Sequence, residues 1–179
     1  MLRLFVALTI PEEVKERTAP MLSGLRDSRW VSPENLHITL RFIGEVDEAT
    51  AQDIDAELAD VRGRPIEIEL SGADVFESRG RVRAVWTRVL GVEPLTQLQG
   101  RVENAVRRAG LDPDAHKYTP HVTLARLKNV PIHEVAPYLA YHGAFRAGPF
   151  TSDHFVLFRS HMGHGGSHYE PLVEYDLLG

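Results

Sequence analysis

The sequence predicts an α+β protein built mostly from antiparallel sheet. Expected strands and helices alternate irregularly, and several strands follow one another directly, which favours this class over a parallel α/β sheet. Residues with period-two alternation or strand composition occupy 2–9, 36–44, 66–70, 82–89, 121–127, 150–159 and 169–178. Helices are expected at about 11–25, 48–61, 94–109 and 131–139.

Helix boundaries follow from local signals. Proline and acidic residues, Pro11-Glu12-Glu13, open the first helix, where a missing N–H and negative charge are best tolerated. In the second helix, Ile54 and Leu58 are spaced to share one face. The third helix carries an apolar stripe before Gly110, a plausible stop signal; the stripe is Leu95, Leu98, Val102 and Val106.

Turn residues separate the strands. Arg79-Gly80 separates the two central strands, and a glycine-rich stretch, residues 163–166, joins the last two. Trp30-Val31 precede a loop at residues 32–35. Because no long Pro-, Gly- or Ser-rich linker interrupts the chain, we expect one domain over residues 1–179.

Composition excludes several classes of protein. Hydrophobic residues make up 43% and charged residues 25% of the 179, as in ordinary globular domains. With no cysteine, the chain has no disulfide, thiolate ligand or cysteine nucleophile, which fits a cytoplasmic enzyme. The apolar start lacks the features of a signal peptide, and no run is long enough to span a membrane. A formal charge of -5 argues against bulk coating of nucleic acid but permits a local cationic cleft.

Two segments repeat the pattern His-x-Thr-Leu. They begin at His37 and His121, 84 residues apart (121 − 37), and each reads as a strand. Alternation places His37 and Thr39 on one face, and likewise His121 and Thr123. If the two halves of the chain pack about a pseudo-twofold axis, four polar groups converge on one cavity.

This set of side chains suits metal-independent phosphodiester displacement. One histidine removes a proton from the nucleophile and the other protonates the leaving oxygen, since an imidazole does either near neutral pH. Threonine hydroxyls then hydrogen-bond to the non-bridging phosphate oxygens. A single His-x-Thr in a strand is usually structural, but two copies with the same alternation favour function.

These motifs resemble the signature of the 2H phosphoesterase superfamily, and in particular the RNA 2',3'-cyclic phosphodiesterases, also called 2'-5' RNA ligases. The resemblance extends over nearly the whole chain. It includes residues 3–8 with Pro11, residues 30–31 and 33–46, residues 118–126, residues 155–160, and residues 169–172.

The resemblance implies a bilobal fold with two pseudo-symmetric halves and mostly antiparallel sheets flanking a central cleft. It implies that His37 protonates the departing 3' oxygen and that His121 accepts the proton from water. Thr39 and Thr123 correspond to the family's phosphate-binding hydroxyls. The expected substrate is RNA or an oligonucleotide with a 2',3'-cyclic phosphate end, opened to a 2'-phosphate, with 2'-5' ligation as the reverse reaction. A monomer that needs no metal or other cofactor is expected.

Phe42 and Arg126 each lie five residues after a motif histidine. Simple alternation puts both on the apolar side, so they reach the cleft only through a bulge or at the end of a strand. In the cleft, Phe42 would stack on a base and Arg126 would pair with phosphate; otherwise they are a core phenylalanine and a surface arginine. Arg41 alternates onto the side of His37 and is either an exposed edge residue or a ligand contact.

Three other readings stay open. Histidines at 161, 164 and 168 invite a metal site, but no carboxylate or cysteine lies among them and the surrounding glycines favour a solvated loop. A non-catalytic nucleotide- or RNA-binding module is a second alternative, which the presence of both histidines and both threonines disfavours. A phosphodiesterase of the same superfamily acting on another small nucleotide is the third. His116, His133, His142 and His154 have no matching partners and are expected at the surface or in structural roles.

Overall fold

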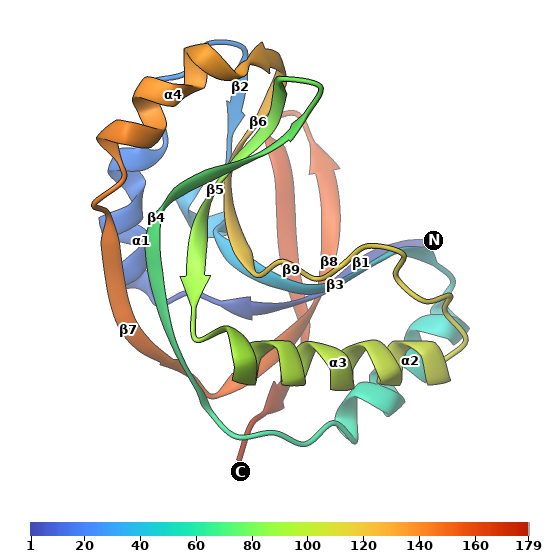
Figure 1. Ribbon diagram of the computed structural model, residues 1–179. Helices are drawn as coiled ribbons and strands as arrows, with labels where there is room; N and C mark the ends of the chain where they lie inside the picture. The colour runs from blue at the N-terminus through green and yellow to red at the C-terminus, as the bar shows by residue number, and fades with distance from the viewer. Residues whose placement is uncertain (179) are drawn as a thin grey trace.

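Two antiparallel sheets form the framework of the protein, for which the computed structural model describes residues 1–178 (Figure 1). The first sheet has the order β3-β1-β8-β9, formed by β1 (Leu2–Thr9), β3 (His37–Val46), β8 (His154–Gly163) and β9 (Gly166–Asp176). The second has the order β2-β6-β5-β4-β7, formed by β2 (Ser28–Trp30), β4 (Ile66–Ser78), β5 (Arg81–Leu90), β6 (His121–Pro131) and β7 (Arg146–Ser152). Every neighbouring pair is antiparallel. The predicted α+β class and the two lobes are confirmed.

Within residues 1–178, four α-helices flank the sheets. They are α1 (Glu12–Thr18), α2 (Glu48–Ala59), α3 (Val92–Arg108) and α4 (Ile132–Tyr141), with short 3-10 turns η1 (Ala19–Met21) and η2 (Pro33–Asn35). Figure 1 shows α1 and α4 on the side of β7 and β4, whereas α2 and α3 pack together at the opposite end, beneath β1 and β3. Across residues 1–178, no helix is both long and apolar enough to cross a bilayer.

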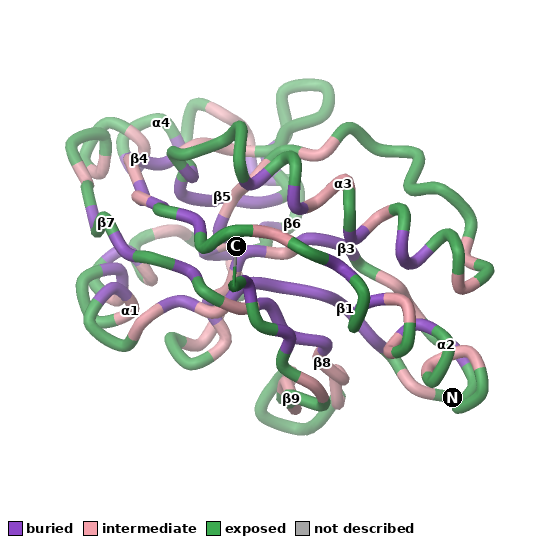
Figure 2. Tube along the Cα trace, turned by 90° about the horizontal axis from the view of Figure 1, so that it is seen from below, coloured by how far each residue is buried: buried purple, intermediate pink, exposed green. Residues whose placement is uncertain are grey.

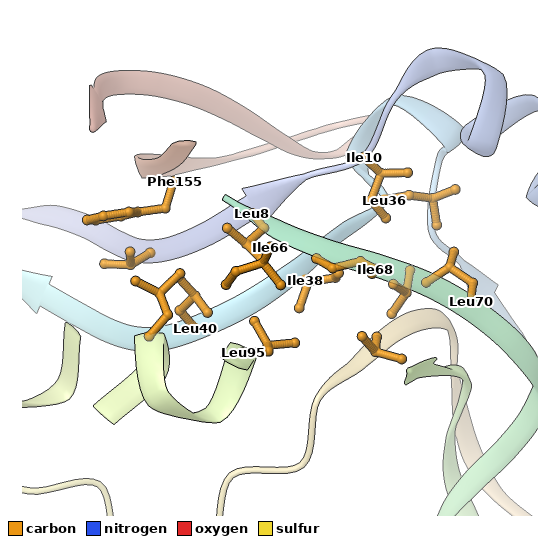
Figure 3. Close-up of a cluster of buried hydrophobic side chains, with 14 of the residues drawn as sticks. Leu8, Ile10, Leu36, Ile38, Leu40, Ile66, Ile68, Leu70, Leu95 and Phe155 are labelled. Atoms are coloured by element: carbon orange, nitrogen blue, oxygen red, sulfur yellow. The ribbon is translucent and has the colours of Figure 1, made fainter. Parts of the chain in front are cut away.

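The core is shared by both sheets and by α3. Figure 3 shows Leu8 and Ile38 from the first sheet facing Ile66 and Ile68 from β4, with Leu95 of α3 beside them. The predicted apolar stripe of α3 is buried along its length. In Figure 2 the buried segments run through the central strands, and the exposed segments lie mainly on the outer turns and loops. The motif strands β3 and β6 are therefore anchored from behind by a common apolar interior.

The lobes do not coincide with the two halves of the chain. The expected strand at residues 150–159 is two strands, because β7 pairs with β4 in the second sheet and β8 pairs with β1 in the first. The chain changes sheets at Asp153, between Ser152 and His154. As a result, the C-terminal hairpin β8–β9 completes the sheet that carries the first motif.

Two local expectations differ from the structure near the first motif. The first helix ends at Thr18 rather than near Leu25, and a 3-10 turn that includes Pro20 follows it. Residues 28–30 form a short edge strand, β2, that pairs with β6. Pairing with β6 joins this N-terminal segment to the second sheet, beside the second motif.

Candidate active site

His37 begins β3 directly after the η2 turn. Its Nδ1 lies 2.7 Å from the carbonyl oxygen of Asn35. Because a carbonyl oxygen only accepts, Nδ1 must carry the hydrogen and donate it. The other ring nitrogen, Nε2, lies 3.0 Å from the hydroxyl of Thr39. The backbone therefore fixes the ring, and Nε2, next to the motif threonine, is the ring nitrogen that the backbone does not hold.

His121 begins β6 in the same way. Its Nδ1 donates to the carbonyl oxygen of Thr119, 2.6 Å away and again two residues earlier in the chain. Within residues 1–178, no hydrogen-bond partner is recorded for its Nε2. Both histidines thus have the same tautomer when neutral, and in both it is Nε2 that the backbone leaves unheld.

A β-bulge follows each motif. In the pairing of β3 with β1, Val6 lies opposite Arg41 and Ala7 lies opposite Thr39, so Leu40 is an extra residue. In the pairing of β6 with β5, Val85 lies opposite Ala125 and Trp86 lies opposite Thr123, so Leu124 is the corresponding extra residue.

The bulges shift the alternation of both strands by one residue. Leu40 and Arg41 are both buried, as are Leu124 and Ala125, and the next residues, Phe42 and Arg126, are exposed. Cross-strand partners project to the same side of a sheet. Phe42 and Arg126 therefore project to the same side as the histidine and threonine of their own motif.

Arg41 is neither an exposed edge residue nor on the side of His37, as simple alternation would have it. The bulge turns it inward, where it is 7% exposed and forms an ion pair with Glu103 of α3. It also donates to the carbonyl oxygens of Phe42 and Asp112. Its role is to tie β3 to α3 and to the loop after α3.

Two aromatic rings enclose each histidine. His37 lies 5.0 Å from Phe5 and 5.4 Å from Tyr169, measured between ring centroids. His121 lies 4.9 Å from Phe76 and 5.5 Å from Trp86. These four aromatic residues lie on β1, β9, β4 and β5, outside the two motif strands. The repeated motif therefore could not predict them.

Burial lowers the pKa of His37 below its ordinary value, and the nearby positive charges of His121, Lys15 and Arg126 lower it further. Burial likewise lowers the pKa of His121, with a further contribution from Arg126. The hydrogen bonds to the backbone carbonyls oppose both shifts. Because Arg126 acts on both rings and His121 acts on His37, the three side chains share one electrostatic environment.

Contacts across the lobes hold this region together. Tyr118, three residues before His121, donates from its hydroxyl to the carbonyl oxygen of Thr39, 2.8 Å away. Burial raises the pKa of Tyr118 far above its ordinary value, so the hydroxyl stays protonated as a donor. The structure thus brings both predicted motifs to one site.

The glycine-rich stretch near residue 164 is the exposed tip of the β8–β9 hairpin, as expected of a solvated connection between the last two strands. The side-chain amide of Asn35 donates to the carbonyl oxygen of Ser167, 2.8 Å away, which fastens the hairpin beside His37. His161 is paired with Glu170 at 2.8 Å. Within residues 1–178, no three His, Cys, Asp or Glu side chains are grouped as a metal site requires.

The sequence did not single out several contributors to this site. Asn35 and Thr119 act through their backbone carbonyls, and Lys15 through its charge on His37. Every residue has a backbone carbonyl, so the residue type at positions 35 and 119 could not reveal these contacts. The sequence offered only the equal spacing, two residues before each motif histidine. Among the other unmatched histidines, His154 contacts Asp153 and Thr9, and His133 is exposed on α4.

Known proteins are similar in sequence to this chain over most of its length. The profile of the 2'-5' RNA ligase superfamily matches residues 10–164. A protein from Archaeoglobus fulgidus named RNA 2',3'-cyclic phosphodiesterase is 35% identical over 130 residues, which is 71% of this chain and 73% of the relative. One of the same name from Methanocaldococcus jannaschii is 28% identical, covering 97% of this chain and 100% of its own.

Solved structures agree with the fold. The crystal structure of Escherichia coli LigT complexed with 3'-AMP superimposes with a TM-score of 0.76 and 25% identity, covering 98% of both chains. The matched profile covers well over half of the chain, and the paired motifs lie within it. The chain therefore belongs to the 2'-5' RNA ligase superfamily, the 2H phosphoesterases.

Proposed function

We propose that the protein is an RNA 2',3'-cyclic phosphodiesterase that opens the cyclic phosphate at an RNA end to a 2'-phosphate. The observation that carries this proposal is the matched setting of His37 and His121. Each Nδ1 is held by the carbonyl oxygen two residues earlier, which leaves each Nε2 for the substrate. Relatives from several organisms carry the name of this activity.

In the proposed reaction, His121 is neutral and its Nε2 accepts a proton from water. The water oxygen attacks phosphorus while the bond from phosphorus to the 3' oxygen breaks. His37, charged at the start, gives the proton on Nε2 to that departing oxygen. The product carries a 2'-phosphate and a free 3' hydroxyl. The donor and acceptor roles follow the family pattern, and each proton transfer needs only one imidazole.

Burial and the surrounding cations disfavour a proton on His37 in the free enzyme. A bound cyclic phosphate counteracts them, because an anion next to an imidazole favours its charged form. In the free protein the Thr39 hydroxyl contacts Nε2 of His37. We propose that the hydroxyl turns to a phosphate oxygen when substrate binds, with Thr123 doing the same from the other strand.

We assign phosphate binding to Arg126 and base stacking to Phe42. Both positions follow a bulge that turns the side chain to the motif side of its strand. Phe42 is 50% exposed, with the guanidinium of Arg3 5.7 Å from its ring centroid. An exposed ring held on a strand supplies a stacking surface for a nucleobase.

The test is incubation with a short oligoribonucleotide ending in a 2',3'-cyclic phosphate, followed by identification of the product. We expect a 2'-phosphate, turnover that persists in EDTA, and no turnover by a His37→Ala/His121→Ala control. A 3'-phosphate product would overturn the assigned bond cleavage. Tight binding without turnover would favour the non-catalytic module, and faster cleavage of a different small nucleotide would favour the other superfamily activity.

The same site would also support ligation through a 2'-5' bond. The 5' hydroxyl oxygen of a second RNA attacks phosphorus in place of water and gives its proton to His121, while the bond to the 3' oxygen breaks and His37 protonates that oxygen, leaving a 2'-5' phosphodiester and a free 3' hydroxyl. We expect ligation to be measurable only with a high concentration of 5'-hydroxyl ends, because water at its full concentration competes for the cyclic phosphate.

A further inference from the structure

A groove extends from the candidate active site along the edge strand β2. Two adjoining hollows, of about 690 and 410 Å³, share three lining residues: Arg29, Trp30 and Arg126. The smaller hollow is also lined by Asn35 and Tyr169, the residues that hold and contact His37. We name these two hollows together the β2 groove.

Arg29 and Arg126 lie directly opposite each other in the pairing of β2 with β6. Side chains in such pairs project to the same side, and like charges placed there repel. Within residues 1–178, no ion pair or side-chain hydrogen bond is recorded for either guanidinium. Anionic groups bound at these two guanidiniums would offset the repulsion.

The rest of the groove is also cationic. Lys128 lines the larger hollow and, by strand alternation, shares the side of Arg126. The one carboxylate that lines it, Asp27, is paired with Arg26 at 2.6 Å. In a chain with a formal charge of -5, this concentration of unpaired cations beside the reaction centre indicates a binding site for an anion.

We propose that Arg29 binds the phosphodiester immediately upstream of the reactive phosphate, that is, the 5' phosphate of the terminal nucleotide. This inference rests on the proposed function, in which Arg126 contacts the cyclic phosphate. Neighbouring strands lie about 4.8 Å apart, and an arginine side chain reaches beyond that distance. The fork of a guanidinium also matches phosphate oxygens. The substrate class is therefore an RNA chain rather than a free mononucleotide.

The test compares adenosine 2',3'-cyclic phosphate with the dinucleotide ApA that ends in the same cyclic phosphate. The wild-type kcat/KM should favour the dinucleotide by about 10- to 100-fold, the worth of a hydrogen-bonded charge pair. In Arg29→Ala that preference should fall to about twofold or less, and Arg29→Lys should restore part of it. Arg107→Ala, an exposed arginine on α3, is the matched control and should keep the wild-type ratio.

Binding and salt dependence separate this proposal from the proposed function. Equilibrium binding of ApA 2'-phosphate and adenosine 2'-phosphate needs no turnover, and Arg29→Ala should weaken only the first by about 10- to 100-fold. The dinucleotide's log affinity should fall more steeply with log salt, by roughly 0.7 for the extra phosphate, and Arg29→Ala should abolish the difference. The urea midpoint of Arg29→Ala should not fall, because a like-charge contact is relieved.

Two outcomes would overturn the inference while leaving the proposed function intact. One is a wild-type enzyme that hydrolyses both cyclic phosphates equally well. The other is an Arg29→Ala variant that keeps the dinucleotide preference. Hydrolysis of neither compound, together with selective binding of ApA 2'-phosphate through Arg29, would overturn the proposed function alone.

Discussion

At the scale of single residues, the two motif histidines are held by the backbone in the same way but have different neighbours. His37 has the Thr39 hydroxyl at its free nitrogen, and Lys15 as well as Arg126 acts on its charge. His121 has no hydrogen-bond partner at Nε2 within residues 1–178. In that part of the chain, Arg126 is the only charged side chain that contributes to lowering its pKa. An unpartnered nitrogen suits a proton acceptor, and a nitrogen with an adjustable hydroxyl suits a donor whose proton must be retained until bond cleavage.

Removing either imidazole should nearly abolish hydrolysis. We expect His37→Ala and His121→Ala each to lower kcat by roughly 10² to 10⁴, the usual contribution of a positioned acid or base. The rate is measured with an oligonucleotide ending in a 2',3'-cyclic phosphate. His133→Ala, at an exposed position outside the site, is the control. A motif variant with near-normal kcat would remove that histidine from the mechanism.

The threonine hydroxyls should matter less than the imidazoles. Thr39→Ala and Thr123→Ala should each cost about 1 to 3 kcal/mol of transition-state stabilisation, as expected for hydrogen bonds to a charged oxygen. The corresponding Thr→Ser variants keep the hydroxyl and should recover most of the loss in kcat/KM. Equal losses in the Ala and Ser variants would indicate that the methyl group, through packing, is what matters.

The pH dependence should reflect the lowered pKa of both histidines. The proposed active form has neutral His121 and charged His37, so kcat/KM should be bell-shaped. Its acid limb reports the loss of neutral His121 as pH falls, and its alkaline limb the loss of charged His37 as pH rises. Because both pKa values lie below the ordinary histidine value, the maximum should lie on the acidic side of about pH 6.5.

The profile of kcat should differ on one side. Bound phosphate stabilises the charged form of His37, so the alkaline limb of kcat should lie at higher pH than that of kcat/KM. Steady-state rates from about pH 4.5 to 9 on the same oligonucleotide give both profiles. Superimposable alkaline limbs would mean that the substrate's charge does not act on the proton donor.

At the scale of elements, the bulge in each motif strand decides which later side chains lie on the same side as the motif histidine. An extra residue, Leu40 or Leu124, reverses the alternation after the motif. In β3 this turns Phe42 outward and Arg41 into contact with Glu103 on α3. One backbone irregularity thus brings a further side chain to the side of the motif and, in β3, also forms a buried link to the helix behind it.

Breaking that link should destabilise the protein strongly. The side chains of Arg41 and Glu103 are 8% and 15% exposed, so Arg41→Ala leaves a mostly buried carboxylate without its cation, with only the backbone N–H of Asp114 still donating to it. We expect a loss of about 3 to 5 kcal/mol in the free energy of unfolding, measured by urea denaturation. Arg107→Ala on the outside of α3 should change it by less than about 0.5 kcal/mol. A small effect for Arg41→Ala would show that water or another side chain satisfies Glu103.

At the scale of the whole molecule, the site depends on the meeting of two sheets. The first motif belongs to β3 in one sheet and the second to β6 in the other, and both strands rest on a common core. Tyr118 connects them directly through the carbonyl oxygen of Thr39. The hairpin that closes one side of the site comes from the C-terminal strands and is held by Asn35.

Removing the Tyr118 hydroxyl should therefore affect stability and catalysis together. We expect Tyr118→Phe to lower the free energy of unfolding by about 0.5 to 1.5 kcal/mol, the net worth of one hydrogen bond, and to lower kcat. Tyr141→Phe, at a residue that is 84% exposed, should leave both unchanged. Loss of stability with an unaltered kcat would mean that the alignment of the motif strands does not depend on this contact.

The sequence alone predicted the α+β class, most strands, the buried stripe of α3 and the two pairs of motif residues, since all of these depend on periodicity within one segment. Only the tertiary structure decided the shorter first helix, the edge strand β2, the change of sheet at Asp153 and the inward turn of Arg41. Each of these depends on which strands pair and in what register. The bulges belong to the same group, because an extra residue is defined only against a partner strand, and so does the placement of Arg29 beside Arg126. Strand pairing joins residues that are far apart in the chain, so a pattern within one segment cannot predict which strands pair.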